Sequence, residues 1–283
     1  MAEVLLFDHI GKTAGSTIRH VLWRVYGREA VFTSTVVGQH QERIAALTGL
    51  LDTERPAVSV IVAHTGYGLH GRLPQRHRYR LFTLLRDPVE RTLSNYYFEI
   101  QKGRLPASVS LVEWLERDVE RAYNVQTAFL GGLAVAVHLD GRVLSRDCFT
   151  DDLLARAREA LDAHEVVGLA ERFDESLLLL GQAFGWPIRQ MRYFEANRGR
   201  LRARRAGPTA EELEAVRAAN RLDAALYDYA RGRFEAQLRE RLPDVDARLD
   251  ALARANRFYA LSAPGLRRQL GRRARRALHT LRS

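Results

Sequence analysis

The chain has 283 residues, 46% of them hydrophobic, so it can bury a full core and form one large domain. Its apolar runs are far shorter than the roughly 20 residues that cross a bilayer, and its N-terminal residues lack a signal pattern, so we expect neither a membrane-spanning helix nor secretion by that route. The single cysteine, Cys148, excludes an internal disulfide and favours a reducing, cytoplasmic location.

The net charge of +10 is concentrated at the C-terminal end. Residues 251–283 hold nine arginines and no acidic residue, which leaves +1 for the rest. A nearly neutral body without a helix-turn-helix or zinc-finger pattern argues against a nucleic-acid partner. We therefore predict an α/β domain at residues 1–245 and a basic helical tail at 246–283. Apolar residues at helical spacing in that tail fit a peripheral membrane contact, an anionic glycan or a solvated helix.

The first 25 residues predict a strand, a short loop and a helix. Residues 4–7 are consecutively apolar, as in a strand covered on both faces, and apolar residues in 18–25 have helical spacing. The loop between them contains Lys12, Thr13, Ala14, Gly15, Ser16 and Thr17. An ammonium group, hydroxyls and the N–H groups of a helix start together predict an anion-binding site. The plain alternative is that Ser16 or Thr17 only caps the helix.

The lysine in this loop is informative. Only Lys12 and Lys102 are lysines among the 44 basic residues, which suggests that the loop needs a compact ammonium group instead of a planar guanidinium. The ATP-type loop G-x-x-x-x-G-K-[ST] has its lysine after the last glycine, whereas Lys12 precedes Gly15. The sequence is therefore a poor match to a nucleotide kinase.

Two further strands are predicted to end at residues that can carry charge. Residues 58–63 are apolar except for Ser59, are largely β-branched and are followed by His64, and residues 79–85 are followed by Arg86. Ligands gather at the carboxyl ends of parallel strands, so we expect both side chains to lie near Lys12.

The third strand leads into a helix that opens on Pro88 with Asp87 as its cap. Ser94 is expected on the polar face of this helix, with Glu90 and Arg91. Separated cations and hydroxyls suit a ligand with two anionic groups, and a histidine between them could act as a base. The sequence shows no metal-ligand pattern near these loops, so we expect no metal.

The rest of the chain continues the alternation. We expect helices at 41–51, 110–117, 122–129, 151–164 and 172–184, strands at 166–169 and 188–194, an arginine-rich loop at 196–207, and helical structure from the capping box of Thr209 and Glu212 to about residue 241. This order predicts an α/β fold, a P-loop-like parallel sheet flanked by helices on both faces, with a mainly helical C-terminal third.

Two segments together resemble a known family. Residues 9–17, HIGKTAGST, are similar to the 5′-phosphosulfate loop H-I-P-K-T-A-G-T-S of sulfotransferases that use 3′-phosphoadenosine 5′-phosphosulfate (PAPS). Residues 85–97, LRDPVERTLSNYY, resemble their 3′-phosphate motif L-R-D-P-x-x-R-x-x-S-x-Y-Y. The likeness is to the carbohydrate branch that contains the heparan sulfate 2-O- and 6-O-sulfotransferases.

The resemblance implies a sulfotransferase that moves a sulfuryl group from PAPS to a hydroxyl acceptor, expected to be a carbohydrate, and leaves the nucleotide product PAP. Lys12 would stabilise the leaving phosphate, and residues 13–17 would bind the 5′-phosphate. Arg86 and Ser94 would bind the 3′-phosphate, and His64 would be the general base. Gly11 in place of proline and Ala63 in place of glycine depart from the family pattern.

Asn124 and Gln126 match a family-like N-x-Q-T pattern, either lining the acceptor side or lying solvated on a helix surface. The arginines of 198–205 are expected to close over the phosphates, to bind an acidic acceptor or to form an exposed loop. A nucleotide-dependent kinase and a non-catalytic protein that binds nucleotides or anionic glycans are the alternative functions.

Overall fold

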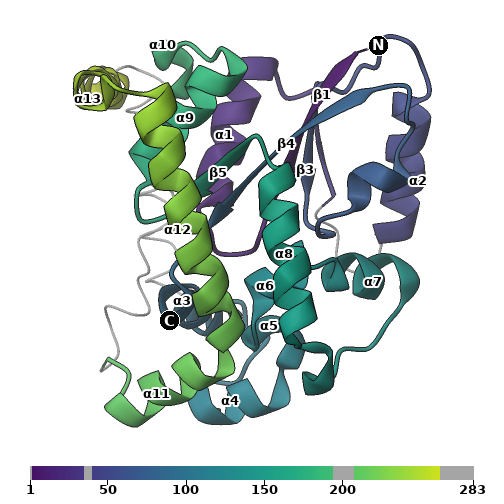
Figure 1. Cartoon of the computed structure of the whole chain (residues 1–283), viewed down its shortest axis with the longest axis vertical. Coiled ribbons are helices and arrows are strands. Elements are labelled where there is room, and N and C mark those ends of the chain that lie inside the picture. The colour runs from purple at the N-terminus through teal and green to yellow at the C-terminus, as the bar shows by residue number, and fades with distance from the viewer. Residues whose placement is uncertain (1, 35–39, 194–206, 262–283) are drawn as a thin grey trace, which may run out of the picture.

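The computed structural model describes residues 2–34, 40–193 and 207–261, and its centre is one parallel β-sheet (Figure 1). Within these residues the strands follow the order β2-β3-β1-β4-β5 across the sheet, and every pairing is parallel. Their bounds are β1 (Glu3–Asp8), β2 (Val31–Thr33), β3 (Val60–Ala63), β4 (Arg78–Leu85) and β5 (Val166–Leu169).

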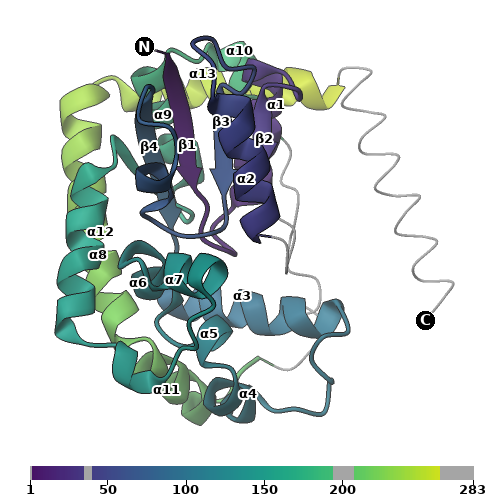
Figure 2. The ribbon, with the colours of Figure 1, turned by 90° about the vertical axis from the view of Figure 1, so that its right-hand side faces the viewer.

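Helices cover both faces of the sheet, as predicted (Figures 1 and 2). Leu5 and Phe7 of β1 pack with α1 and α9 on one side, and Val4 and Leu6 pack with α2 and α7 on the other. The helices are α1 (Gly15–Tyr26), α2 (His40–Leu51), α3 (Pro88–Gln101), α4 (Leu111–Arg117), α5 (Val119–Ala122), α6 (Val125–Leu130), α7 (Leu133–Asp140), α8 (Asp151–Ala163), α9 (Phe173–Phe184), α10 (Ile188–Met191), α11 (Ala210–Ala219), α12 (Arg221–Arg241) and α13 (Val245–Leu261), with 3₁₀ turns at Leu69–Arg72 and Arg146–Cys148.

Four of the predicted strands are confirmed: β1, β4 and β5 lie where expected, and β3 begins at Val60, two residues later than predicted. Strand β2 was not predicted. It has only three residues and lies at the edge of the sheet, so it is too short to show an alternating pattern.

The strand predicted at 188–194 is wrong, because residues 188–191 form the helix α10. Pro187 precedes the helix, and its carbonyl accepts hydrogen bonds from the N–H groups of Gln190 and Met191. Ile188 and Met191 then lie three residues apart on one side of a helical turn and pack into the main core. Proline at a helix start and this i, i+3 spacing outweighed the apolar composition that suggested a strand.

The helix predicted at 122–129 begins three residues later, as α6, and a separate short helix, α5, ends at Ala122. Asn124 lies between them in the left-handed region, with φ of 42°, and its Oδ1 accepts hydrogen bonds from the N–H groups of Leu222 and Asp223. A long-range contact with α12 therefore sets this break, which no local pattern could reveal. The helix α7 was also not predicted.

The C-terminal third is helical, as expected, and the capping box of Thr209 and Glu212 is present at the start of α11. The helix α13 begins at the predicted domain boundary and buries Leu252 in the main core, so the first part of the predicted tail packs against the domain. Residues 262–283 lie outside the described residues. Among the helices that are described, none is both long and apolar enough to cross a membrane.

We predict that Gly168→Ala lowers the free energy of unfolding by about 1–3 kcal/mol, because a methyl group there overpacks the contact between β5 and α9. A Cβ at Gly168 would lie 2.9 Å from Ser176 Cβ and 3.0 Å from Leu84 Cγ. Urea unfolding measures the change. The control is Gly49→Ala in α2, where a Cβ meets no atom within 4 Å and alanine favours the helix. Equal stabilities of the two variants would contradict this packing.

Candidate active site

Three neighbouring strands end together and bring the predicted site residues to one edge of the sheet. Asp8 of β1 is in register with Ala63 of β3 and with Thr83 of β4. The N–H of His9 donates to the carbonyl of Ala63 at 2.8 Å, which extends the pairing by one residue. The carboxyl ends of these strands face α3, α6 and α7 (Figure 2). Lys12, His64 and Arg86 follow these three strands, as the sequence predicted.

The loop after β1 ends in a helix start that carries no side-chain cap. Helix α1 begins at Gly15, and its N-cap is Ala14, with φ of 66° and no side-chain hydrogen bond. Ser16 and Thr17 lie inside the first turn, so the interpretation of either as the cap is wrong. Lys12, with φ of 74°, and Ala14 both adopt the left-handed conformation that non-glycine residues rarely take. The Thr17 N–H donates to the carbonyl of Ala14 at 2.9 Å, so an anion at this end of α1 would meet the N–H groups of Gly15 and Ser16.

Buried contacts hold the loop in this shape. Thr13 is fully buried, and its hydroxyl donates to the carbonyl of Ile10 at 2.9 Å, so Thr13 supports the loop from inside. The ring of His20 donates from Nδ1 to the carbonyl of Ser16 at 2.6 Å. Ser16 and Thr17 are half-buried.

Position 15 must be glycine because the ring of His9 packs against it. His9 was not among the predicted site residues. A Cβ at Gly15 would lie 1.7 Å from Nε2 of His9. The His9 ring therefore occupies the space beside the helix start, and its Nδ1 lies 2.8 Å from Nε2 of His64. Burial lowers the pKa of His9 well below its usual value, and the nearby His64, Arg19 and Lys12 add to this effect. The position of His9 in the first motif was the signal that could have identified it.

Lys12 lies in a concentration of positive charge. Its Nζ is 3.8 Å from the centre of the Phe98 ring, a cation–π contact. The charged groups of Arg104 and Lys102 lie 5.2 and 5.6 Å from the same ring centre. Burial, followed by repulsion from Arg86 and Arg91, lowers the pKa of Lys12 to about 8.

Arg86 is held by several long contacts. Its Nη1 donates to the carbonyl of Lys12 at 3.3 Å, Nη2 lies 3.4 Å from Glu90, and Nε lies 3.6 Å from Glu171. These distances exceed those of good charge-assisted hydrogen bonds. The guanidinium therefore remains able to bind a better-placed anion.

Gln126 fixes the backbone of Arg86. The Gln126 side chain is fully buried, accepts from the Arg86 N–H at 2.9 Å and donates to the Arg86 carbonyl at 2.8 Å. The start of α6 is fixed in turn, because Asp223 accepts from the N–H groups of Gln126 and Thr127. Asn124 is also buried. Neither Asn124 nor Gln126 is a solvated surface amide, and their contacts favour a positioning role over the predicted contact with an acceptor.

Ser94 lies on the same face of α3 as Glu90 and Phe98, because the three are spaced four residues apart. Glu90 contacts Arg86 and Phe98 contacts Lys12, so the half-buried Ser94 lies between these two cations along the helix.

The prediction that Arg91 lies on the polar face of α3 with Ser94 and Glu90 is wrong. Arg91 is 2% exposed, and its Nη2 donates to the carbonyl of Arg121 at 3.0 Å. Burial lowers its pKa to about 10. The negative charge of Asp223 partly offsets that cost by electrostatic attraction, and Asp223 belongs to α12, a distant part of the sequence.

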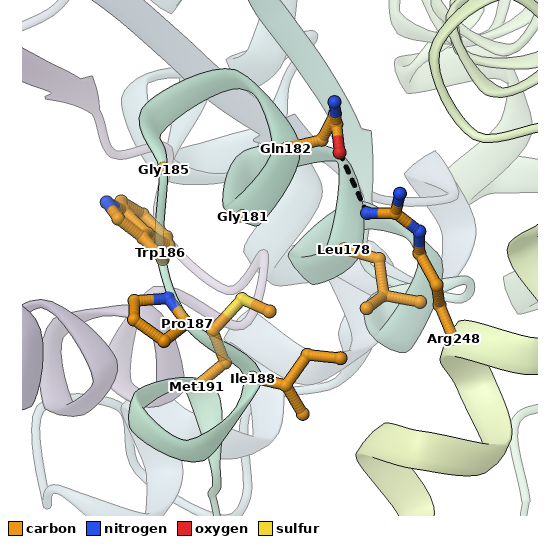
Figure 3. A pocket seen from close by; sticks show the side chains of 9 residues that line it. All are labelled: Leu178, Gly181, Gln182, Gly185, Trp186, Pro187, Ile188, Met191 and Arg248. Carbon is orange, nitrogen blue, oxygen red and sulfur yellow. Dashed lines mark hydrogen bonds between the residues drawn. The ribbon is translucent and has the colours of Figure 1, made fainter.

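Other features lie outside this cluster. The arginines of 198–205 fall outside the described residues. A cavity of about 260 Å³ lies between α9, α10 and α13, with the Gln182–Arg248 hydrogen bond beside it (Figure 3). Helices α10 and α13 lie at the opposite end of the sheet from α3, α6 and α7 (Figure 2). Within the described residues, no group of three or more His, Cys, Asp or Glu side chains could hold a metal ion.

We predict that Arg86→Gln raises the pKa of Lys12 from about 8 toward the ordinary lysine value of 10.5, because it removes a neighbouring positive charge. NMR titration of protein with isotope-labelled lysine gives only two signals, from Lys12 and Lys102. Arg28→Gln, at an exposed position, is the matched control. An unchanged Lys12 titration in Arg86→Gln would contradict the proposed charge cluster.

Comparisons with known proteins agree with these motifs. The family model described as galactose-3-O-sulfotransferase matches residues 2–258. Galactose-3-O-sulfotransferase 3 of Bos taurus is 28% identical over 246 residues, which cover 79% of this chain and 55% of that protein. Galactose-3-O-sulfotransferase 3 of Homo sapiens is 28% identical over 244 residues, which cover 79% of this chain and 54% of that protein. The chain thus spans a little over half the length of these relatives. The predicted likeness to carbohydrate sulfotransferases is confirmed, and the chain belongs to the galactose-3-O-sulfotransferase family.

Proposed function

We propose that this chain transfers a sulfuryl group from PAPS to a hydroxyl group of a carbohydrate. The observation that carries the proposal is the meeting of an uncapped helix start, Lys12, Arg86 and His64 at the carboxyl ends of β1, β3 and β4. Membership of the galactose-3-O-sulfotransferase family supports the same reaction.

The two phosphate groups of PAP or PAPS match two separate parts of the site. The start of α1, with Gly15, Ser16 and Thr17, offers backbone N–H groups and hydroxyls to the 5′-phosphate. Arg86 and Ser94 form the second part, and we assign the 3′-phosphate to them. Arg86 would exchange its long contacts with Glu90 and Glu171 for shorter ones with a dianion, which its planar guanidinium suits.

The proposed chemistry is a direct displacement at sulfur. The acceptor oxygen forms a bond to sulfur while the bond from sulfur to the bridging phosphate oxygen breaks. The acceptor proton passes to His64, and the developing negative charge on the PAP phosphate is stabilised by the Lys12 ammonium. Catalysis of this type depends mostly on positioning and charge, as in phosphoryl transfer. A bound dianion would raise the pKa of Lys12 above its value of about 8.

The 3-hydroxyl of galactose is the first acceptor to test, because two relatives carry galactose-3-O-sulfotransferase in their names. In this proposal the acceptor hydroxyl lies beside His64, whose Nε2 is 2.8 Å from Nδ1 of His9 in the loop before α1. The cytoplasmic location and the membrane or glycan contact of the basic tail stay predictions.

We predict that Lys12→Ala lowers kcat by a factor on the order of 10²–10³ and has a smaller effect on PAP affinity, because the ammonium acts mainly when charge develops on the leaving group. The readout is label transfer from PAPS to a galactose-terminated glycan, together with calorimetric binding of PAP. Wild-type kinetics in Lys12→Ala would remove the catalytic assignment of this residue.

Arg86→Ala is predicted to act mainly on binding. It removes a charge-assisted contact to phosphate, which corresponds to a loss of PAP affinity on the order of 10- to 100-fold. Arg239→Ala, at an exposed position on α12, is the matched control and should bind PAP normally. Undiminished PAP binding by Arg86→Ala would show that the 3′-phosphate lies elsewhere.

A thermal-shift titration separates the proposed donor from that of a kinase. PAP should raise the melting temperature in a concentration-dependent way, and ATP should raise it much less, because ATP lacks the 3′-phosphate. Stabilisation by ATP but not by PAP would instead support the nucleotide-kinase alternative.

A further inference from the structure

His9 and His64 are in contact within the site, and this contact bears on the tautomer of His64, the proposed base. Nδ1 of His9 and Nε2 of His64 are 2.8 Å apart, and the ring centres are 4.0 Å apart at an interplanar angle of 55°. The backbone fixes both positions, since the His9 N–H donates to Ala63 and the His64 N–H donates to the hydroxyl of the buried Ser34. The contact is therefore built into the ends of two adjacent strands.

Only one hydrogen can lie between these two nitrogens, so the contact links the tautomers of the two rings. His9 is 8% exposed, and its ring stacks on Phe7 with centres 5.0 Å apart. Burial, followed by the nearby His64, Arg19 and Lys12, lowers the pKa of His9 and so favours its neutral form, which has one N–H and one acceptor nitrogen. If His9 accepts at Nδ1, its own hydrogen must be on Nε2.

The other side of the His9 ring faces the nucleotide loop. Nε2 of His9 lies where a Cβ of Gly15 would be, at the first residue of α1. An anion bound at this helix start attracts an N–H and repels a nitrogen lone pair. A bound 5′-phosphate would therefore favour the tautomer with hydrogen on Nε2, which leaves Nδ1 as an acceptor for His64.

We propose that His9 is a positioning residue. It couples nucleotide binding to the tautomer of His64, which is the proposed base. With the phosphate bound, His9 accepts a hydrogen bond from Nε2–H of His64 and fixes Nδ1 of His64 as the atom that takes the acceptor proton. His9 then stabilises the imidazolium that forms on His64. This inference rests on the proposed function, because it assumes that His64 is the base.

The tautomers can be observed without turnover. Nitrogen NMR of histidine-labelled full-length protein saturated with PAP should show hydrogen on Nε2 and not on Nδ1 of His9, and hydrogen on Nε2 of His64. The signals are assigned with His9→Asn and His64→Ala. Hydrogen on Nδ1 of His9 in the PAP complex would overturn the proposal, whatever the activity of the chain.

Kinetics test the role of His9 in the reaction. His9→Phe keeps a flat ring without its nitrogens. We expect it to lower kcat on the order of 10- to 100-fold, as for residues that orient a metal-bound histidine, and to weaken PAP binding by a smaller factor, because the Nε2–H that attracts the 5′-phosphate is lost. Loss of the acceptor should also move the acidic limb of the plot of kcat against pH to lower pH, because the imidazolium of His64 is no longer stabilised.

His9→Asn can still offer an acceptor near the Nδ1 position and should recover part of the rate.

The outcomes separate this proposal from the proposed function. Full activity in His64→Ala, with N-acetyllactosamine as the acceptor probe, would remove His64 as the base. A large loss in His64→Ala with unchanged kcat and pH profile in His9→Phe would overturn the role of His9 alone. If His9→Phe does not fold, the PAP-bound NMR spectrum of the wild-type protein still decides the proposal.

Discussion

The site depends on one constraint, the parallel register that makes β1, β3 and β4 end side by side. Each strand then delivers a different chemical group to the same edge: an ammonium, an imidazole and a guanidinium. The loop after β1 accepts two left-handed non-glycine residues, each at a cost on the order of 1–3 kcal/mol, and begins α1 without a cap. The buried contacts of Thr13 and His9 offset this strain, and the result is a helix start that can receive an anion.

A second layer of contacts fixes the groups that bind ligand. The Asp223 carboxylate holds the first N–H groups of α6, and Gln126 of that helix holds the Arg86 backbone on both its donor and its acceptor side. Burial of the Asp223 carboxylate is tolerable because the buried Arg91 lies near it and several N–H groups donate to it. The C-terminal helices thereby contribute to a site whose motifs lie in the first third of the chain.

The sequence allowed the sheet and most of the candidate site to be predicted, because strong local patterns mark them. Continuous apolar runs identified the central strands, and the residues after them identified Lys12, His64 and Arg86. Local patterns failed where distant contacts decide the conformation. The break at Asn124 depends on α12, the burial of Arg91 depends on Asp223, and the pairing of His9 with His64 joins residues 55 positions apart. The prediction for residues 188–191 failed for a local reason, since the proline before α10 favours a helix start more than the apolar composition favours a strand.

The central claim is that one nucleotide spans the start of α1 and the Arg86 side chain. A crystal structure of the chain with PAP tests it most directly. The account predicts the 5′-phosphate at the N–H groups of Gly15 and Ser16 and the hydroxyls of Ser16 and Thr17, within reach of the Lys12 ammonium, and the 3′-phosphate between Arg86 and Ser94. A PAP molecule bound in the reverse orientation, or in the cavity between α9, α10 and α13, would contradict it.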